Sequence, residues 1–486
     1  MKLKRVIVIS LLILAVLTVG SVSASDNLTD TIELSDEVMS SPQEDILGES
    51  DDGTFSALND KIDNAEAGST ITLENNYANT DGFDSEGIVI DKDLTINGNG
   101  YTIDGLSASR IFKIKDCTVT LNNIKFTNGH AIENYAKNYV GSGGAIYAVS
   151  TALTVNSCTF TNNMADLHGG AIFSSSYEHT LTINSCTFTG NVAKATSGAV
   201  DASCIGLQIT DSSFNQNSAG SSGGAISSLS WDGNGNHLKD TITNCIFTNN
   251  RAGSHGGAIR IDSKLSIASS TFTNNDAGAC GGALYTNEDL TVTNSRFTKN
   301  HASENGGAIH AQGYNLEVIN GVRKITYYNV LIQDSTFSSN VANEVGGAIA
   351  TTTYGAESTY PKVVRSTFTG NKAKDSNDIS GFVATNCKFD AAPAKIKFTL
   401  KSVKVKKSAK KLVLTATLKK GSKALKGKKI TFKFNGKKFT AKTNKKGVAK
   451  VTIKKKVLKK LKVGKKVKYQ ASYGKLTVKK SAKVKK

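Results

Sequence analysis

Four side chains in the middle of the chain could take part in acid–base chemistry, namely Asp201, Arg260, Asp262 and His310. Asp201, Arg260 and His310 lie at one phase of a repeat, thirteen residues after a recurrent phenylalanine, and Asp262 follows Arg260 by two residues. In β-structure Asp201 and Arg260 would be two strands apart, about 10 Å. Hydrolysis of a glycosidic bond needs two carboxylates roughly 5–10 Å apart. Asp201 and Asp262 barely meet this condition, so we expect no catalysis, with cleavage of an acidic polysaccharide as the alternative.

The seven histidines show no spacing typical of metal ligands. His168 and His255 each precede a Gly-Gly pair, at a repeat position that elsewhere holds Ser222, Cys280 or Asn305, which indicates a turn. Asp-x-Asp calcium loops are also missing. We therefore expect neither a metal nor a cofactor.

Four of the seven cysteines occupy a repeat position that holds serine in other copies, two residues before the phenylalanine. A position that accepts serine or cysteine is most simply a small site in the core, because a free thiol behaves as a small apolar group. A disulfide between Cys158 and Cys186, on adjacent repeats, remains open. The four are Cys158, Cys186, Cys245 and Cys387.

All these residues belong to a repeat with the frame Phe-x2-Asn-x-Ala-x3-Gly-Gly-Ala-Ile. In the first seven copies the Gly-Gly pair begins nine residues after the phenylalanine, although Ser197 replaces its first glycine once. The phenylalanines recur at intervals of 25 residues and more, and a period of this length indicates a solenoid. The phenylalanines are Phe160, Phe188, Phe214, Phe247, Phe272, Phe297, Phe337 and Phe368.

Short β-branched segments separated by Gly, Asn and Asp predict an all-β solenoid over residues 53–390, in which each repeat forms one coil of parallel strands. We expect three strands per coil, with the phenylalanines stacked inside about 4.8 Å apart. The repeat Asn should occupy an inner corner, with left-handed backbone geometry and an amide bonded to the next coil. The glycines should supply positive φ angles, and Ala should fit a tight corner. Residues 55–67 have helical spacing and should cap the first coil.

The linked Gly-Gly-Ala-Ile and Phe-x-x-Asn motifs resemble the repeats of chlamydial polymorphic outer-membrane proteins and of adhesin-like surface proteins of methanogenic archaea. Residues 94–105 resemble the first coils of the wider pectate-lyase-like group of β-helices. The resemblance covers about residues 55–390 and implies a right-handed parallel β-helix on the cell surface. The lysine-rich C-terminal segment departs from the membrane β-barrel with which the chlamydial proteins end. We therefore expect the archaeal type of architecture and do not carry over autotransport.

Insertions occur in only one part of the repeat, between Ala-Ile and the next phenylalanine, at residues 227–240, 310–329 and 350–362. They should protrude on one side of the solenoid, which is the default binding surface of such proteins. Exposed tyrosine and tryptophan suit carbohydrate or protein contacts. Loops that are merely tolerated remain an equal alternative. The candidate binding residues are Trp231, Tyr314, Tyr327, Tyr328, Tyr354 and Tyr360.

The N-terminus reads as a signal for export. Residues 1–24 combine a basic start, an apolar stretch from Val6 to Gly20 and small residues before Ser25, which is typical of a signal peptide. Residues 25–52 are acidic and without periodicity, and predict a flexible leader. The protein should be secreted or on the cell surface, and touch the membrane only transiently through the signal peptide.

The net charge of +20 conceals two opposite parts. Residues 391–486 hold 36 of the 60 basic residues, all lysine, and no acidic residue, so the rest of the chain has 24 basic against 40 acidic residues. Residues 394–486 contain alternating strand patterns and an Asn435-Gly436 hairpin turn. Residues 443–453 resemble a segment of invasin-type bacterial Ig-like domains. This implies a lysine-covered Ig-like β-sandwich.

These lysines should bind a polyanion in a salt-dependent way. Export, the absence of arginine and the scarcity of aromatic residues argue against specific nucleic-acid recognition, so the expected partner is a cell-wall or envelope polymer. A lysine-covered surface without a specific partner is the alternative. Together the parts predict a non-catalytic surface adhesin whose loops bind a carbohydrate or protein of another cell.

Overall fold

The computed structural model describes residues 51–134, 140–232, 234, 236–319, 322–352, 361–390 and 396–486. The predicted signal peptide and nearly all of the predicted leader lie outside these residues, as do Tyr354 and Tyr360. Neither helix of the described residues has the length and apolar character of a membrane-spanning segment.

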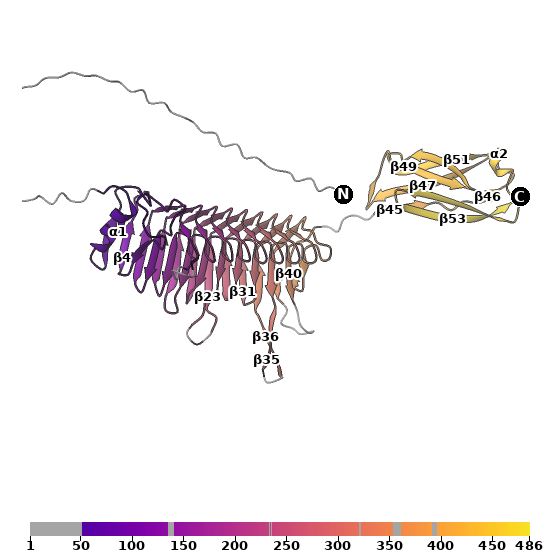
Figure 1. Ribbon diagram of the computed structural model, residues 1–486. Coiled ribbons are helices and arrows are strands. Elements are labelled where there is room, and N and C mark those ends of the chain that lie inside the picture. The colour runs from indigo at the N-terminus through magenta and orange to yellow at the C-terminus, as the bar shows by residue number, and fades with distance from the viewer. Residues whose placement is uncertain are drawn as a thin grey trace, which may run out of the picture. The chain divides into compact units, whose positions relative to one another are not determined.

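Residues 51–390 form a parallel β-helix in which each coil contributes strands to several long sheets, as predicted (Figure 1). Following the chain through one coil, we name them sheets 1 to 4. Sheet 1 contains β1 (Ser69–Thr72), β4 (Leu94–Asn97), β7 (Thr118–Asn122), β11 (Ala152–Asn156), β15 (Thr180–Asn184), β19 (Gly206–Thr210), β23 (Lys239–Thr243), β27 (Lys264–Ala268), β31 (Leu290–Thr293), β37 (Val330–Gln333), β41 (Lys362–Val364) and β44 (Val383–Thr385).

Sheet 2 carries the phenylalanines. It contains β2 (Tyr77–Ala78), β5 (Thr102–Asp104), β8 (Lys125–Thr127), β12 (Thr159–Thr161), β16 (Thr187–Thr189), β20 (Ser213–Asn215), β24 (Ile246–Thr248), β28 (Thr271–Thr273), β32 (Arg296–Thr298), β38 (Thr336–Ser338) and β42 (Thr367–Thr369). Between Phe368 and Phe126 each ring lies 4.7–5.0 Å from the next, with nearly parallel planes, so the predicted ladder is confirmed.

Sheet 3 is a short sheet that the sequence did not predict, because its strands have only two residues. It contains β9 (His130–Ala131), β13 (Met164–Ala165), β17 (Val192–Ala193), β21 (Ser218–Ala219), β25 (Arg251–Ala252), β29 (Asp276–Ala277), β33 (His301–Ala302) and β39 (Val341–Ala342). The alanines of all copies except the last, which begins at Phe368, lie here, and these alanines are buried.

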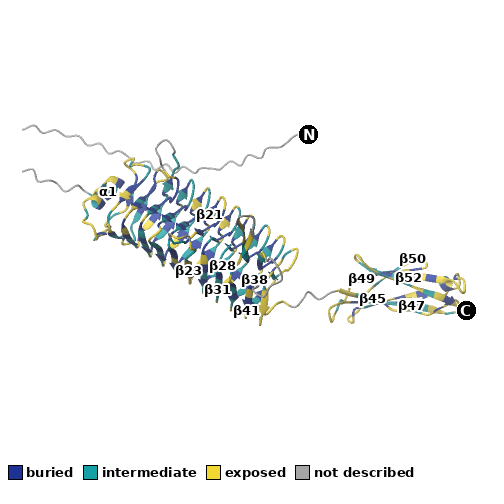
Figure 2. Ribbon diagram, turned by 90° about the horizontal axis from the view of Figure 1, so that it is seen from below, coloured by how far each residue is buried: buried dark blue, intermediate teal, exposed yellow. Residues whose placement is uncertain are grey.

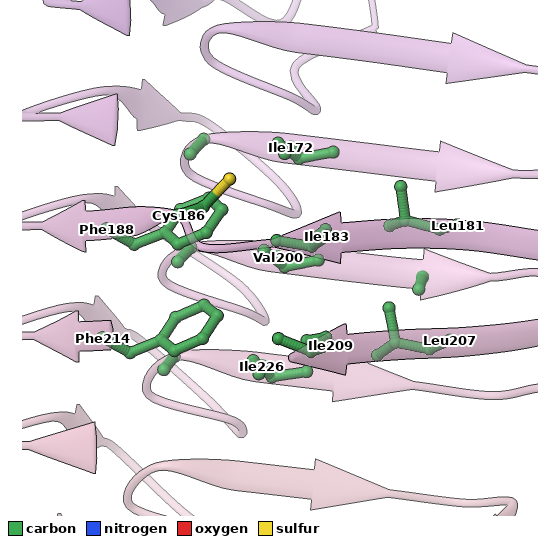
Figure 3. Packing of buried hydrophobic residues seen from close by; sticks show 14 of the residues in the cluster. Ile172, Leu181, Ile183, Cys186, Phe188, Val200, Leu207, Ile209, Phe214 and Ile226 are labelled. Carbon is green, nitrogen blue, oxygen red and sulfur yellow. The ribbon is translucent and has the colours of Figure 1, made fainter. Parts of the chain in front are cut away.

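Sheet 4 follows the Gly-Gly pair. It contains β3 (Ile88–Ile90), β6 (Phe112–Lys115), β10 (Ile146–Val149), β14 (Ile172–Ser175), β18 (Val200–Ser203), β22 (Ile226–Ser228), β26 (Ile259–Ile261), β30 (Leu284–Thr286), β34 (Ile309–Gln312), β40 (Ile349–Thr352) and β43 (Ile379–Ser380). Inward residues of sheets 1, 2 and 4 stack on their equivalents in the next coil, as Leu181 does on Leu207 and Phe188 on Phe214 (Figure 3). Buried residues therefore run along the whole β-helix (Figure 2).

The repeat asparagines form the predicted amide ladder, but the left-handed backbone lies one residue earlier. Asn275, for example, donates from Nδ2 to Asn300 Oδ1 at 2.9 Å, whereas Asn274 has the positive φ of 57°. The prediction of left-handed geometry at the ladder asparagine itself was wrong. The ladder residue must point its amide inward, so the exposed residue before it makes the turn.

The two glycines of each pair also have different roles. Gly256 has a φ of 65°, as predicted, and Ser197 adopts 65° where it replaces this glycine. The second glycine has no positive φ. A Cβ at Gly257 would lie 2.1 Å from the carbonyl oxygen of Gly282, so that position is required for close approach of the coils.

Helix α1 (Phe55–Asp63) covers the first coil, as predicted, although it ends earlier than residue 67. Its buried residues Phe55, Leu58 and Ile62 belong to the core of the β-helix. The Thr54 side chain accepts a hydrogen bond from Ala57 N and caps the helix.

All seven cysteines are free thiols, and six are buried. Cys158 and Cys186 thus form no disulfide; the sulfur of Cys186 instead accepts a hydrogen bond from Cys158 N at 3.4 Å. Burial raises the pKa of Cys158 to about 12. The prediction of a small core position is confirmed for Cys158, Cys186 and Cys245, whereas Cys387 is only partly buried.

Residues 396–486 form a sandwich of two sheets around their own core. One sheet contains β45 (Ile396–Leu400), β47 (Lys411–Lys420), β48 (Lys423–Ala424) and β51 (Val448–Lys454). The other contains β46 (Val405–Lys406), β53 (Leu476–Lys485), β52 (Lys466–Tyr473), β49 (Lys429–Phe434) and β50 (Lys437–Lys442), and the short helix α2 (Lys455–Leu458) follows β51. Asn435 and Gly436 both have positive φ and join β49 to β50, so the predicted hairpin is confirmed. The Ig-like assignment stays a prediction.

Candidate functional site

Two of the three predicted insertions leave the same corner of the β-helix, between sheet 4 and sheet 1 (Figure 1). Residues 229–238 connect β22 to β23. The hairpin formed by β35 (Tyr314–Ile319) and β36 (Val322–Tyr327) lies between β34 and β37. The prediction that insertions project on one side is confirmed for these two.

A cavity of about 730 Å³ lies between the first insertion, the hairpin and the corner of sheets 4 and 1. Almost all of its lining side chains are polar, and it holds both acidic and basic groups. Among the candidate residues, Asp262, Tyr327 and Tyr328 lie here. The other residues that line the cavity are Asn236, His237, Lys264, Asn287, Glu288, Asp289, Gln312, Asn315, Lys324 and Thr326. We call this cavity the corner pocket.

Arg260 and Asp262 form an ion pair at the edge of the corner pocket, with 2.6 Å between Nη2 and Oδ2. Burial raises the pKa of Asp262, against the opposing effect of the Arg260 charge. Three other polar atoms of this cluster lack partners: Asp262 Oδ1, Arg260 Nε and Asn287 Oδ1 are buried without a hydrogen bond to the described protein. Buried polar groups usually have partners, so these atoms indicate a place where a polar ligand or water binds.

His310 lies on the outward face of sheet 4, next to Tyr285 in the neighbouring strand. Three rings stack there, with 4.6 Å between His255 and Tyr285 and 5.4 Å between Tyr285 and His310. Burial lowers the pKa of His310 to about 4, and the neighbouring His255 acts in the same direction. Its Nδ1 is buried without a hydrogen-bond partner in the described residues. His310 is therefore neutral at physiological pH.

Trp231 lies in the first insertion but does not line the corner pocket. Its ring packs edge-on against Tyr177, with 5.5 Å between the centroids. Its indole Nε1 is buried and unpaired within the described part of the chain. At the other end of this insertion, His237 Nδ1 lies 2.8 Å from Glu288 Oε1 and joins the insertion to the wall of the pocket.

Asp201 lies on β18, separated from β26 and its Arg260 by one strand, as the repeat spacing predicted. Its Oδ2 accepts hydrogen bonds from Thr196 Oγ1 at 2.9 Å and Ser197 Oγ at 2.6 Å. Asp201 therefore stabilises the turn in which Ser197 replaces glycine, and it does not line the corner pocket. Tyr314 pairs with Tyr327 across the base of the hairpin.

Most of the pocket's polar residues were missed by the sequence reasoning. Asp262, Asn287 and Gln312 share one phase of the repeat, fifteen residues after Phe247, Phe272 and Phe297. That phase alone could have pointed to Asn287 and Gln312. Glu288 and Asp289 carry no such signal, because their part of the repeat varies in length. No group of three potential metal ligands occurs among the described residues.

Comparison with known proteins bears on the repeats alone. Six segments match the family described as the Chlamydia polymorphic membrane protein repeat, at residues 157–175, 211–229, 244–262, 269–287, 294–312 and 334–352. No curated protein matches the chain. Each segment runs from the turn before the phenylalanine to the strand of sheet 4, so it includes the outward residues that lead to the corner pocket. The β-helix is thus built from repeats similar to those of the chlamydial polymorphic membrane proteins, which points to a location at the cell surface.

Proposed function

We propose that the protein is an exported, non-catalytic adhesin of the cell surface. In this proposal the corner pocket binds a carbohydrate of another cell, and the lysine-rich sandwich attaches the protein to an anionic polymer of its own envelope. The observation that carries the binding role is the set of buried polar atoms without partners beside a polar pocket.

The chemistry of the pocket favours a carbohydrate over a protein segment. Carbohydrate hydroxyls both donate and accept hydrogen bonds, so they can satisfy Asp262 Oδ1 and Asn287 Oδ1 as donors and Arg260 Nε as an acceptor. Tyr327 and Tyr328 add apolar ring surface at the side of the hairpin. A protein partner would instead be expected to need a more apolar central patch.

The hairpin provides the sharpest test. The preceding coil joins β30 to β31 with only Asn287, Glu288 and Asp289, so replacing residues 312–329 by Asn-Glu-Asp should leave the coil intact. We expect this variant to keep its thermal stability and to lose at least about tenfold in affinity for the polysaccharides that the full chain binds on an immobilised panel, since a wall of the pocket is removed.

Point variants refine this test. Asn287→Ala should weaken binding about tenfold, because it removes the buried, unpartnered Oδ1 atom that lines the pocket. Val318→Ala is the control, since Val318 is 64% exposed on the hairpin and does not line the pocket. Equal losses in both variants, or no polysaccharide bound by the full chain, would contradict the proposed carbohydrate site.

Cleavage of an acidic polysaccharide is the second candidate, and one observation favours it. Asp262, whose pKa is raised, shares the corner pocket with Glu288 and Asp289. Glycosidases combine a protonated and an ionised carboxyl group in this manner. If this candidate holds, the full chain releases reducing ends from an acidic polysaccharide, and Asp262→Asn abolishes the release whereas Asp201→Asn does not. A panel without any release excludes it.

The lysine-rich sandwich supports the attachment. It contains no acidic residue, so none of its lysines can form an ion pair with an acidic side chain of the sandwich itself. Attachment to an anionic envelope should therefore weaken with salt. We expect the full chain to bind wall preparations and to be released at moderate ionic strength; retention that ignores salt would contradict an electrostatic attachment.

A further inference from the structure

The two faces of the lysine-rich sandwich differ in charge. Strand alternation places ten exposed lysines on the outer face of the five-stranded sheet but only five on that of the four-stranded sheet. The five are Lys397, Lys411, Lys419, Lys450 and Lys454. We call the outer face of the five-stranded sheet the lysine face; its lysines are Lys406, Lys429, Lys433, Lys438, Lys442, Lys466, Lys468, Lys479, Lys483 and Lys485.

The register of the strands places lysines of the lysine face directly opposite one another. Lys429 is paired with Lys442, Lys433 with Lys438, and Lys466 with Lys483. Like charges at opposed positions destabilise a sheet. Because the sandwich has no acidic residue to offset them, a bound polyanion would relieve this repulsion.

A row of hydroxyl groups crosses the lysine face beside these charges. Thr440, Thr431, Ser472 and Thr477 are successive partners across β50, β49, β52 and β53. The Ser472 and Thr477 hydroxyl oxygens are 3.0 Å apart. The neighbouring row consists of Lys438, Lys433, Gln470 and Lys479, and lies about 7 Å away along the strands.

We propose that the lysine face binds a linear polysaccharide that carries carboxylate groups, with its chain lying across the strands. This rests on the proposed attachment to the envelope and names both the face and the polymer. Lysine rows supply charge for the carboxylates, and the hydroxyl row suits the sugar hydroxyls. The face holds no arginine, the residue that recognises phosphate with two hydrogen bonds, and its outward positions hold no aromatic ring for stacking on bases.

The test uses the full chain and two variants of equal net charge. The face variant carries Lys→Gln changes at Lys433, Lys438, Lys468 and Lys479, and the control variant carries them at Lys397, Lys411, Lys419 and Lys454. The affinity for polygalacturonate, a linear carboxylated polysaccharide, is measured at NaCl concentrations from about 50 to about 200 mM. The dependence of this affinity on salt reports the number of ionic contacts. Polyphosphate is the second probe, and thermal melting confirms that both variants fold.

We expect the face variant to lose about tenfold or more in affinity for polygalacturonate and to have a shallower salt dependence, since about three to four ionic contacts are removed. The control variant should lose less than about threefold, the loss expected from net charge alone. Equal losses of affinity in the face variant and the control variant would overturn the inference. Binding of polyphosphate to the same face more tightly than polygalacturonate would overturn it as well. A full chain that binds wall preparations but not polygalacturonate overturns this inference alone, whereas binding to neither overturns the proposed attachment too.

Discussion

Replacement of Asn275 by alanine is expected to lower the free energy of unfolding of the β-helix by about 3–5 kcal/mol, because it leaves buried polar groups of two other coils without partners. Asn275 Nδ2 donates to Phe247 O at 3.1 Å and to Asn300 Oδ1 at 2.9 Å. Its Oδ1 accepts from Asn250 N at 3.0 Å and Asn250 Nδ2 at 2.9 Å. The side chain is fully buried, so water cannot replace these contacts without entering the core.

The adjacent residue supplies a matched control. Asn274 has the same side chain but is exposed, and glycine can adopt its φ of 57°. Asn274→Gly should therefore change stability by less than about 1 kcal/mol. Urea unfolding together with hydrogen exchange of β24 and β28 measures both variants. Similar losses of unfolding free energy in Asn275→Ala and Asn274→Gly would show that the turn, and not the amide ladder, stabilises the corner.

Replacement of Phe272 by alanine is expected to destabilise the β-helix by about 3–5 kcal/mol, the usual effect of removing a fully buried aromatic ring. Its ring lies 4.7 Å from those of both Phe247 and Phe297, and all three rings are fully buried. The change would leave a cavity in the middle of the ladder, where the neighbouring coils are fixed by their own hydrogen bonds. Urea unfolding measures the loss.

Phe389 is the control for position in the ladder. It lies at the end of the stack, contacts Phe368 at 5.0 Å and is 44% exposed. Since its side chain is only partly buried, Phe389→Ala should cost no more than about 1.5 kcal/mol. A loss at Phe272 as small as that at Phe389 would refute the view that continuous stacking holds the coils together.

Most of the β-helix could be predicted because each coil places the same residue types at the same positions. Phenylalanine, asparagine and glycine recur at fixed positions of the repeat. Because the strands of successive coils are parallel and in register, each of these residues stacks on the same residue type in the next coil. The errors were local. The sequence does not show that the left-handed residue is Asn274 and not Asn275, since both are asparagine. It also does not show the two-residue strands of sheet 3, because they have no pattern of their own.

The candidate site was predicted only in part. Asp262, Tyr327 and Tyr328 line one pocket, but Asp201 serves a turn and Trp231 packs on Tyr177. The repeat phase correctly places Arg260, Tyr285 and His310 in one column of sheet 4. The repeat phase carries no information on how an insertion folds. The pocket could therefore not be predicted as a whole, because the hairpin, which is an insertion, forms one of its walls.

The sequence by itself determined the repeat, its inside and its corners, and the separation of an acidic β-helix from a lysine-rich sandwich. These follow from residue types at fixed spacing, so they require no knowledge of distant contacts. The tertiary structure decided where chemistry can occur. The corner pocket joins residues 236–237 to Lys324 and residues 326–328, and the lysine face depends on the register of five strands. Such juxtapositions are set by packing between segments far apart in the chain.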